Sequence, residues 1–166
     1  VFIFSQRCEQ VPYMLLTGIA RIRKDGTLER IQNVPFLERT EKELTIRSAP
    51  TVIRDKDGYK MWYVSAHHWE KMNTELFRNK MMPVYSVNFM TSSDGFSYSD
   101  LHVSVLKYAN EDEFGFGRPW VMRDGDVYKM WYSVRSRNSP YSIGYAESVN
   151  GKDWTRKDQE AGIMRS

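Results

Sequence analysis

The stretch Tyr128-Lys129-Met130-Trp131-Tyr132 decides the fold, because the same five residues occur earlier in the chain as Tyr59-Lys60-Met61-Trp62-Tyr63. The two copies lie 69 residues apart, from Tyr59 to Tyr128. Residues before each copy match at this offset too: Pro50, Val52, Arg54 and Asp55 before the first, and Pro119, Val121, Arg123 and Asp124 before the second. Such a repeat indicates one supersecondary unit used several times, since a single unit cannot bury its own apolar face.

A second pair of segments matches downstream of each copy. Tyr85–Gly95 corresponds to Tyr141–Gly151, now at an offset of 56 residues. The first copy therefore carries an insertion, which must fall between Ser65 and Val84. Long loops between strands are more often functional or disordered than simple connections. The residue types over Glu70–Phe77 permit a short helix within the insertion.

Each unit consists of short apolar runs joined by turn signals. Asp57-Gly58 and Asp124-Gly125 separate such runs, and Gly accepts the positive φ that tight hairpin turns require. Within 128–132, Tyr and Met alternate with Lys and Trp, so the strand presents apolar groups on both faces and must be covered on both. In the first unit, Tyr85–Thr91 is predicted as a third strand and a fourth ends near Tyr98.

Four short hairpin-connected strands, used repeatedly, are typical of β-propeller blades. We therefore predict an all-β fold of four-stranded antiparallel blades, about half of a five-bladed propeller. The boundaries are an incomplete blade over 1–40, a blade over 44–105 with the insertion 66–84, and a blade over 113–160. The incomplete blade is predicted to contain a strand at Val1–Phe4 and a hairpin around Asp25-Gly26.

The composition limits the classes of function. The chain has 166 residues, 41% of them hydrophobic and 14% aromatic, which indicates a folded domain with a core. The formal net charge of +3 is mild and no basic cluster stands apart from acidic neighbours, so nucleic acid is not expected as a partner. The single Cys8 excludes an intrachain disulfide. No membrane span or signal peptide is visible, which favours a cytoplasmic location.

Several motifs together resemble a known group of enzymes. Ser48-Ala49-Pro50 precedes a strand, Met130-Trp131-Tyr132 lies in the next, and Ile143–Ser148 is followed by Asn150–Trp154. In these features, and in Gly117–Val121, the chain resembles the five-bladed β-propeller glycoside hydrolases, in particular family 43-like proteins. The resemblance covers about Phe2 to about Lys157 and implies a carbohydrate ligand at the mouth of the propeller channel.

Glycoside cleavage usually requires two carboxyl groups facing one sugar. In such propellers the ligand is reached by the first strand of each blade and the loop before it, which nominates Glu43 and Glu113 as catalytic carboxylates, with Asp112 and Arg118 as substrate-binding residues. Glu147, on a predicted strand, is the third candidate carboxylate. The alternative for each carboxylate is a solvated or turn-forming side chain. For Arg118, between Gly and Pro, the alternative is a structural ion pair.

Other candidate ligand-binding residues follow the repeated strands. His67 is a candidate hydrogen-bond donor, acid or base, and Trp69 a stacking platform, whereas Arg135 occupies the matching place in the other blade. The alternative for the adjacent His67 and His68 is that they anchor a loop. No third ligand accompanies them, so neither a metal site nor any other cofactor is predicted.

Two functions remain open from the sequence. The chain is either a glycoside hydrolase-like enzyme acting on carbohydrate, or a carbohydrate-binding or assembly module without turnover. The acidic residue expected at the start of the family's first blade has no counterpart, which makes the catalytic set incomplete. Because half a propeller would expose apolar blade faces, we expect either a homodimer formed through those faces or a fragment of a longer chain.

Overall fold

Each copy of the repeated stretch forms the central strand of an antiparallel unit. We describe residues 3–4, 11–99 and 102–163 of a computed structural model. The first unit comprises β5 (Ile46–Asp55), β6 (Gly58–Met72) and β7 (Lys80–Ser92), and the second comprises β9 (Glu113–Asp124), β10 (Val127–Ser136) and β11 (Ser142–Ser148). The turn glycines Gly58 and Gly125 have φ of +116° and +59°, as their hairpins require.

A short fourth strand follows in both units. In the first unit it lies later in the chain than the sequence predicts. There, β8 (Val103–Ser104) pairs with β7, and the predicted strand ending near Tyr98 is wrong. The Asp94 carboxylate accepts the backbone N–H groups of Phe96 and Ser97, so these groups cap a turn instead of pairing with a strand. In the second unit, β12 (Thr155–Arg156) pairs with β11.

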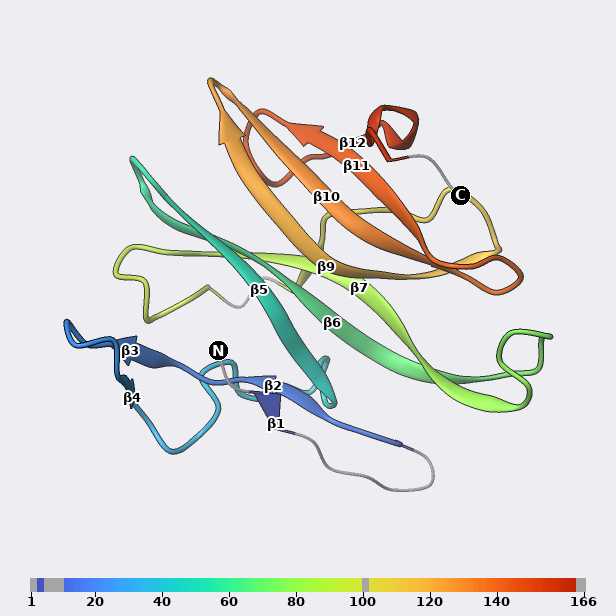
Figure 1. The fold of residues 1–166 in the computed structure, drawn as a ribbon, viewed down its shortest axis with the longest axis horizontal. Coiled ribbons are helices and arrows are strands. Elements are labelled where there is room, and N and C mark those ends of the chain that lie inside the picture. The colour runs from blue at the N-terminus through green and yellow to red at the C-terminus, as the bar shows by residue number, and fades with distance from the viewer. Residues whose placement is uncertain (1–2, 5–10, 100–101, 164–166) are drawn as a thin grey trace.

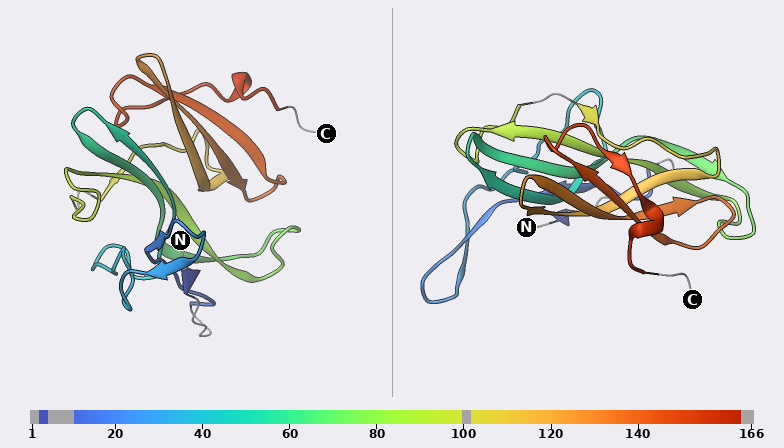
Figure 2. Two further views of the ribbon diagram at one scale, coloured as in Figure 1. Left: turned by 60° about the vertical axis from the view of Figure 1, so that its left-hand side comes forward. Right: turned by 90° about the horizontal axis from the view of Figure 1, so that it is seen from above.

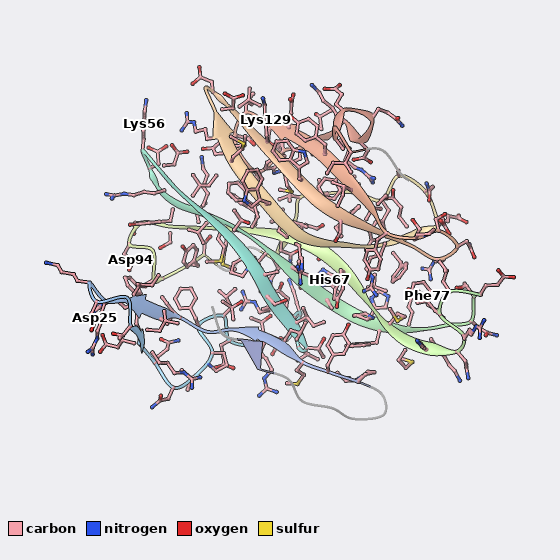
Figure 3. All side chains as sticks on the ribbon, in the orientation of Figure 1. Asp25, Lys56, His67, Phe77, Asp94 and Lys129 are labelled. Carbon is pink, nitrogen blue, oxygen red and sulfur yellow. The ribbon has the colours of Figure 1, made fainter. Side chains whose placement is uncertain are left out.

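The insertion lengthens a hairpin instead of forming a helix. β6 and β7 remain paired as far as Met72 and Lys80, and a loop over 73–79 joins them. The predicted helix over Glu70–Phe77 is therefore wrong, because pairing across the hairpin outweighs a weak intrinsic helix preference. Phe77 lies at the tip, opposite the β5–β6 turn that carries Lys56 (Figure 3). We call the Phe77 side of the molecule the Phe77 end.

The amino-terminal part contains four short strands: β1 (Ile3–Phe4), β2 (Leu15–Thr17), β3 (Ala20–Ile22) and β4 (Leu28–Arg30). The predicted hairpin around Gly26 is confirmed, since β3 and β4 pair and Gly26 has a φ of +83°. The predicted strand at Val1–Phe4 is confirmed for Ile3 and Phe4, whereas Val1 and Phe2 lie outside the described residues.

The units join into one continuous mixed sheet. Its strand order is β1-β2-β5-β6-β7-β9-β10-β11-β12, with β8 attached to β7, and β3–β4 forms a separate sheet. β2 runs parallel to β5, and β7 runs parallel to β9 through the pair Tyr85–Gly115. In Figure 1 the β5–β7 unit lies between the amino-terminal strands and the β9–β12 unit, and the left view of Figure 2 shows the same order from another side. The all-β prediction is confirmed, and the sheet formed by the described residues is open.

The main core lies between the two repeated units. Trp62 is fully buried, packs against Tyr128 and Trp154, and donates its indole N–H to the Gly151 carbonyl at 2.7 Å. Asp55 at the end of β5 accepts hydrogen bonds from Lys60, and from Tyr128 and Arg123 in the other unit. The other members of this core are Val87, Phe89, Val105, Leu106, Phe116, Val121, Met130, Tyr132, Val134 and Ala146.

The second unit presents the equivalent face to solvent. By the 69-residue offset, Trp131 corresponds to the buried Trp62, but it is only partly buried. Trp131 packs against the exposed Trp120 on one side and Tyr145 on the other, with ring centroids 5.5 and 4.9 Å apart. Burial of the repeated strand on both faces is therefore confirmed for the first unit only.

A β-bulge occurs at the same place in both first strands. Ala49 and Arg118 are equivalent by the repeat, precede Pro50 and Pro119, and have positive φ values of 49° and 46°. The ladder register shifts at both positions. Residues other than Gly rarely adopt this backbone conformation, so each bulge stores strain. The bulge also changes the direction of the side chain at that position.

Candidate functional site

Two clusters of side chains adjoin each other near the starts of β5 and β9. The first, which we call the Glu43 cluster, forms around a carboxylate in the loop before β5. The Glu43 side chain is completely buried. It sits on the face of β6 and β7 that carries Tyr63 and Asn88, two residues that are paired across the ladder.

The Glu43 carboxylate is fully occupied by donors. Oε1 accepts hydrogen bonds from the Tyr63 hydroxyl at 2.9 Å and from Asn88 Nδ2 at 2.8 Å. Oε2 lies 3.1 Å from Arg47 Nε and 2.8 Å from His102 Nδ1. Burial raises the pKa of the Tyr63 hydroxyl, and the neighbouring Glu43 charge raises it further, so Tyr63 remains a proton donor. A buried carboxylate with this many donors is suited to hold its neighbours in place.

The cluster extends toward the surface through polar side chains of β7. The Ser86 hydroxyl donates to Asn88 Oδ1 at 2.9 Å and lies 3.1 Å from His67 Nε2. The structure therefore connects two predicted site residues, the exposed His67 and the buried Glu43, through Ser86 and Asn88. On the neighbouring strand, the buried Ser65 hydroxyl has no hydrogen-bond partner among the described residues.

The second cluster, which we call the Arg135 cluster, collects aromatic rings around one guanidinium. The central carbon of that group lies 4.9 Å from the ring centroid of Tyr85, 5.0 Å from that of Phe114 and 5.4 Å from that of Tyr141. These distances are typical of cation–π contacts. Three strands and one loop supply the residues: β7, the start of β9, the end of β10 and the loop before β11.

Two further rings connect this cluster to the amino-terminal part. The Tyr85 and Tyr13 hydroxyls are 2.8 Å apart, and Tyr13 packs edge-on against Trp69 at 4.8 Å. Trp69 donates its indole N–H to the Thr45 hydroxyl at 3.2 Å. Burial raises the pKa of the Tyr85 hydroxyl, as does its hydrogen bond with Tyr13.

The backbone at Gly115 makes room for the guanidinium. Gly115 pairs with Tyr85 on one side and Arg135 on the other. A Cβ atom at Gly115 would lie 3.2 Å from Arg135 Cδ and 3.3 Å from Tyr85 Cβ. The missing side chain thus lets Arg135 cross the strand toward Tyr85. The guanidinium is buried, and its Nε and Nη1 have no hydrogen-bond partner among the described residues.

A groove of ≈ 860 Å³ adjoins the Arg135 cluster at Tyr141. Glu113, Arg156 and Asp158 also line it. Arg156 donates to both Glu113 oxygens, at 2.6 and 2.8 Å, and its Nη2 lies 2.5 Å from the Asp158 carboxylate. The predicted residue Glu113 therefore shares the groove with Tyr141, whose ring also contacts the predicted residue Arg135.

The remaining predicted residues lie outside the two clusters and contact neighbouring loops and strands. Asp112 accepts hydrogen bonds from the backbone and side-chain N–H groups of Asn138, joining two loops at the Phe77 end. Glu147 accepts hydrogen bonds from Tyr145 and Lys157 on the outer part of the second unit. The Lys157 hydrogen bond, followed by the Tyr145 one, lowers the pKa of the Glu147 carboxyl. Arg118 is exposed at its bulge.

The sequence analysis missed several residues of these two clusters. Tyr13, Tyr85 and Tyr141 were not predicted as site residues, because tyrosines are frequent in these strands and loops. Tyr85 and Tyr141 do correspond to each other by the 56-residue offset, and this is the signal that could have drawn attention to both. His102 and Asn88, which bind Glu43, lie far from it in sequence.

The described residues include no group of three or more potential metal ligands among His, Cys, Asp and Glu. Among the same residues, no helix is long and apolar enough to cross a membrane.

Comparison with known proteins gives relatives over most of the chain. No family model matches it. The uncharacterized proteins Rv1502 and MT1551, from two strains of Mycobacterium tuberculosis, are each 28% identical over 153 residues. These matches cover 92% of this chain and 48% of the relatives. The chain therefore spans about half the length of the curated relatives that it matches.

Solved structures share the fold. A glycoside hydrolase superposes with a TM-score of 0.65 at 20% identity, over 86% of this chain and 43% of that one. The protein BT0996, solved as an RGII complex, gives the same TM-score and identity, over 89% of this chain and 44% of its own length. At this level of identity, these likenesses show the fold alone. The chain has a glycoside hydrolase-like, all-β fold.

Proposed function

We propose that this chain is part of a β-propeller, glycoside hydrolase-like protein and binds carbohydrate at the Phe77 end. The observation that carries the proposal is the Arg135 cluster beside an open groove. Aromatic rings from the amino-terminal part and from both repeated units converge there, together with one guanidinium. Ligand sites commonly combine aromatic walls with a few polar groups in this way.

The chemistry of the cluster suits a sugar. Aromatic rings offer apolar faces against which the C–H face of a sugar ring can pack, while Tyr hydroxyls and the guanidinium can bond its oxygens. Tyr141 is 60% exposed and lines the groove, so it is available for such contact. The resemblance to glycoside hydrolases over most of the chain supports carbohydrate as the ligand class.

Binding without turnover is the form of this function that these residues support best. Hydrolysis requires one protonated and one ionised carboxyl group on either side of the scissile bond. In the groove, Glu113 and Asp158 both accept hydrogen bonds from the same guanidinium, that of Arg156. The two carboxyl groups therefore have similar surroundings, whereas hydrolysis needs two different ones. The Glu43 carboxylate is buried and occupied by donors. We propose that it positions Arg47 and His102.

A glycan-array screen followed by titration of each hit tests the binding. Replacing Tyr141 by Ala should weaken binding about tenfold, equivalent to about 1.4 kcal/mol of contact. Trp120→Ala is the matched control, since Trp120 is 57% exposed and lies on the outer face of the second unit. Equal effects of the two substitutions, or no glycan bound at all, would contradict the proposed site.

The enzymatic alternative is tested on the same hits. Incubation with bound glycans and with aryl glycosides, followed by product analysis, should show no turnover. Release of product that is lost in Glu113→Gln would instead support a hydrolase with Glu113 as a catalytic residue.

A further inference from the structure

We infer that the carbohydrate bound at the Arg135 cluster is acidic, and that a sugar carboxylate of the uronic acid type binds the Arg135 guanidinium. This inference rests on the proposed function and names the class of its ligand. It starts from the contrast between Arg135 and the other buried or half-buried arginines of the chain.

Those other arginines have carboxylate partners. Arg47 lies 3.1 Å from Glu43, Arg137 lies 2.9 Å from Glu70, and Arg156 bonds Glu113. The Arg135 side chain is buried to a similar degree as Arg47, with 6% and 5% of their surfaces exposed. Within the described part of the chain, however, Nε and Nη1 of Arg135 meet no hydrogen-bond acceptor.

The aromatic rings around Arg135 interact with its positive charge but do not accept hydrogen bonds from its in-plane N–H groups. A ring face attracts the positive charge, but the N–H groups point outward in the guanidinium plane and need acceptors there. A buried charge without a partner is strongly unfavourable, so an acceptor beyond the described residues would complete the site, and in this inference the ligand supplies it. A carboxylate matches because it is planar, charged and presents two acceptor oxygens.

The surroundings favour a carboxylate attached to a sugar ring over a small free anion. Tyr85, Phe114 and Tyr141 surround the guanidinium with apolar ring surface that an isolated anion would not use. Tyr141 lies in the loop over 137–141 and contacts both the guanidinium and the groove. Arg135 does not itself line the groove, and its Nε and Nη1 are buried, so a sugar chain in the groove would meet the guanidinium once the Tyr141 ring turns aside.

The test compares an oligohexuronate with its methyl ester, which has the same sugar rings without the charge. Titration is followed by calorimetry. The wild-type protein should bind the acid at least tenfold more tightly than the ester. Arg135→Met should bind both forms equally. The control Arg123→Met, which removes an arginine paired with Asp55 away from the cluster, should keep the preference for the acid.

A stability measurement separates a binding role of Arg135 from a structural one. Without ligand, the thermal midpoint of Arg135→Met should equal or exceed that of the wild type, because the substitution removes an unpaired buried charge. In the wild type alone, the acid should raise the midpoint more than the ester does. A midpoint of the ligand-free variant several degrees below that of the wild type would make Arg135 structural and overturn the inference.

The other outcomes are equally decisive. Equal affinity of the wild type for acid and ester, with either bound, would overturn the acidic ligand but leave carbohydrate binding standing. Acetate or inorganic phosphate bound as tightly as the oligohexuronate would reduce the site to one for simple anions and overturn the sugar part. If neither the oligosaccharides nor any neutral glycan bind, the proposed function fails together with the inference.

Discussion

The Glu43 and Arg135 clusters adjoin each other, each buries one charged side chain, and the two charges have opposite surroundings. Glu43 is surrounded by donors from Arg47, Tyr63, Asn88 and His102. Arg135 is surrounded by rings, and two of its nitrogens meet no acceptor among the described residues. Tyr85 and Ser86, adjacent on β7, belong to the Arg135 cluster and the Glu43 cluster respectively.

The difference teaches how to separate architecture from binding in this molecule. A buried charge with a full set of partners holds elements together, and its loss leaves those partners unpaired. A buried charge with unused donors contributes little to the fold and is available to a ligand. Substitutions in the two clusters should therefore change different measured quantities.

The largest effect is expected at Glu43. Glu43→Gln should lower the free energy of unfolding by about 3 kcal/mol, because Arg47 loses its buried counter-charge. Urea unfolding followed by circular dichroism measures it. Glu41→Gln, an exposed substitution two residues away, should change stability by less than about 0.5 kcal/mol. If both variants are equally stable, Glu43 is not the anchor that its contacts indicate.

An intermediate effect is expected from the Tyr63 hydroxyl at alkaline pH. Its folded-state pKa is raised above the ordinary value of 10.0, by burial first and then by Glu43. The contribution of Tyr63 to stability is therefore complete below pH 10 and is lost as pH rises through the folded pKa. Urea unfolding at pH 8 to 11 should show stability falling above pH 10. Tyr63→Phe should flatten this fall, and it should cost about 2 kcal/mol at pH 8. An unchanged pH slope in the variant would contradict the assignment.

The smallest effect on stability, with a clear effect on binding, is expected at Gly115. Gly115→Ala places a Cβ 3.2 Å from Arg135 Cδ and should destabilise the fold by only about 1 kcal/mol while displacing the guanidinium. Binding of the glycan should weaken severalfold. Gly117→Ala is the control on the same strand, because its Cβ would meet the Ser133 hydroxyl instead. Unchanged binding in Gly115→Ala would separate the ligand site from Arg135.

The sequence repeat predicted most strands correctly, because strands that pack in the same way in each unit need the same residue types at the same positions. The antiparallel units, the turn glycines and the Gly26 hairpin follow directly from residue types. The helix predicted in the insertion is absent, because pairing between β6 and β7 is a long-range contact that local preference does not contain.

The candidate site was only partly predictable for the same reason. Glu43, Glu113 and Arg135 could be nominated from sequence because they lie at fixed places relative to the repeated strands, and their roles stay predictions. His102, which touches Glu43 from 59 residues away, and Tyr13, which touches Tyr85 from 72 residues away, have no local pattern that marks them. Whether a buried charge is fully paired depends on such distant contacts, so it could not be read from sequence.

The tryptophans give the molecule separate optical reporters. Trp62 and Trp154 lie in the core between the repeated units, Trp69 belongs to the proposed ligand site, and Trp120 and Trp131 stack on the outer face of the second unit. Emission from Trp120, which is 57% exposed, should be quenched by iodide, whereas the fully buried Trp62 should be protected. Single-tryptophan variants would therefore show independently when the units separate, when ligand arrives and when the outer face becomes covered.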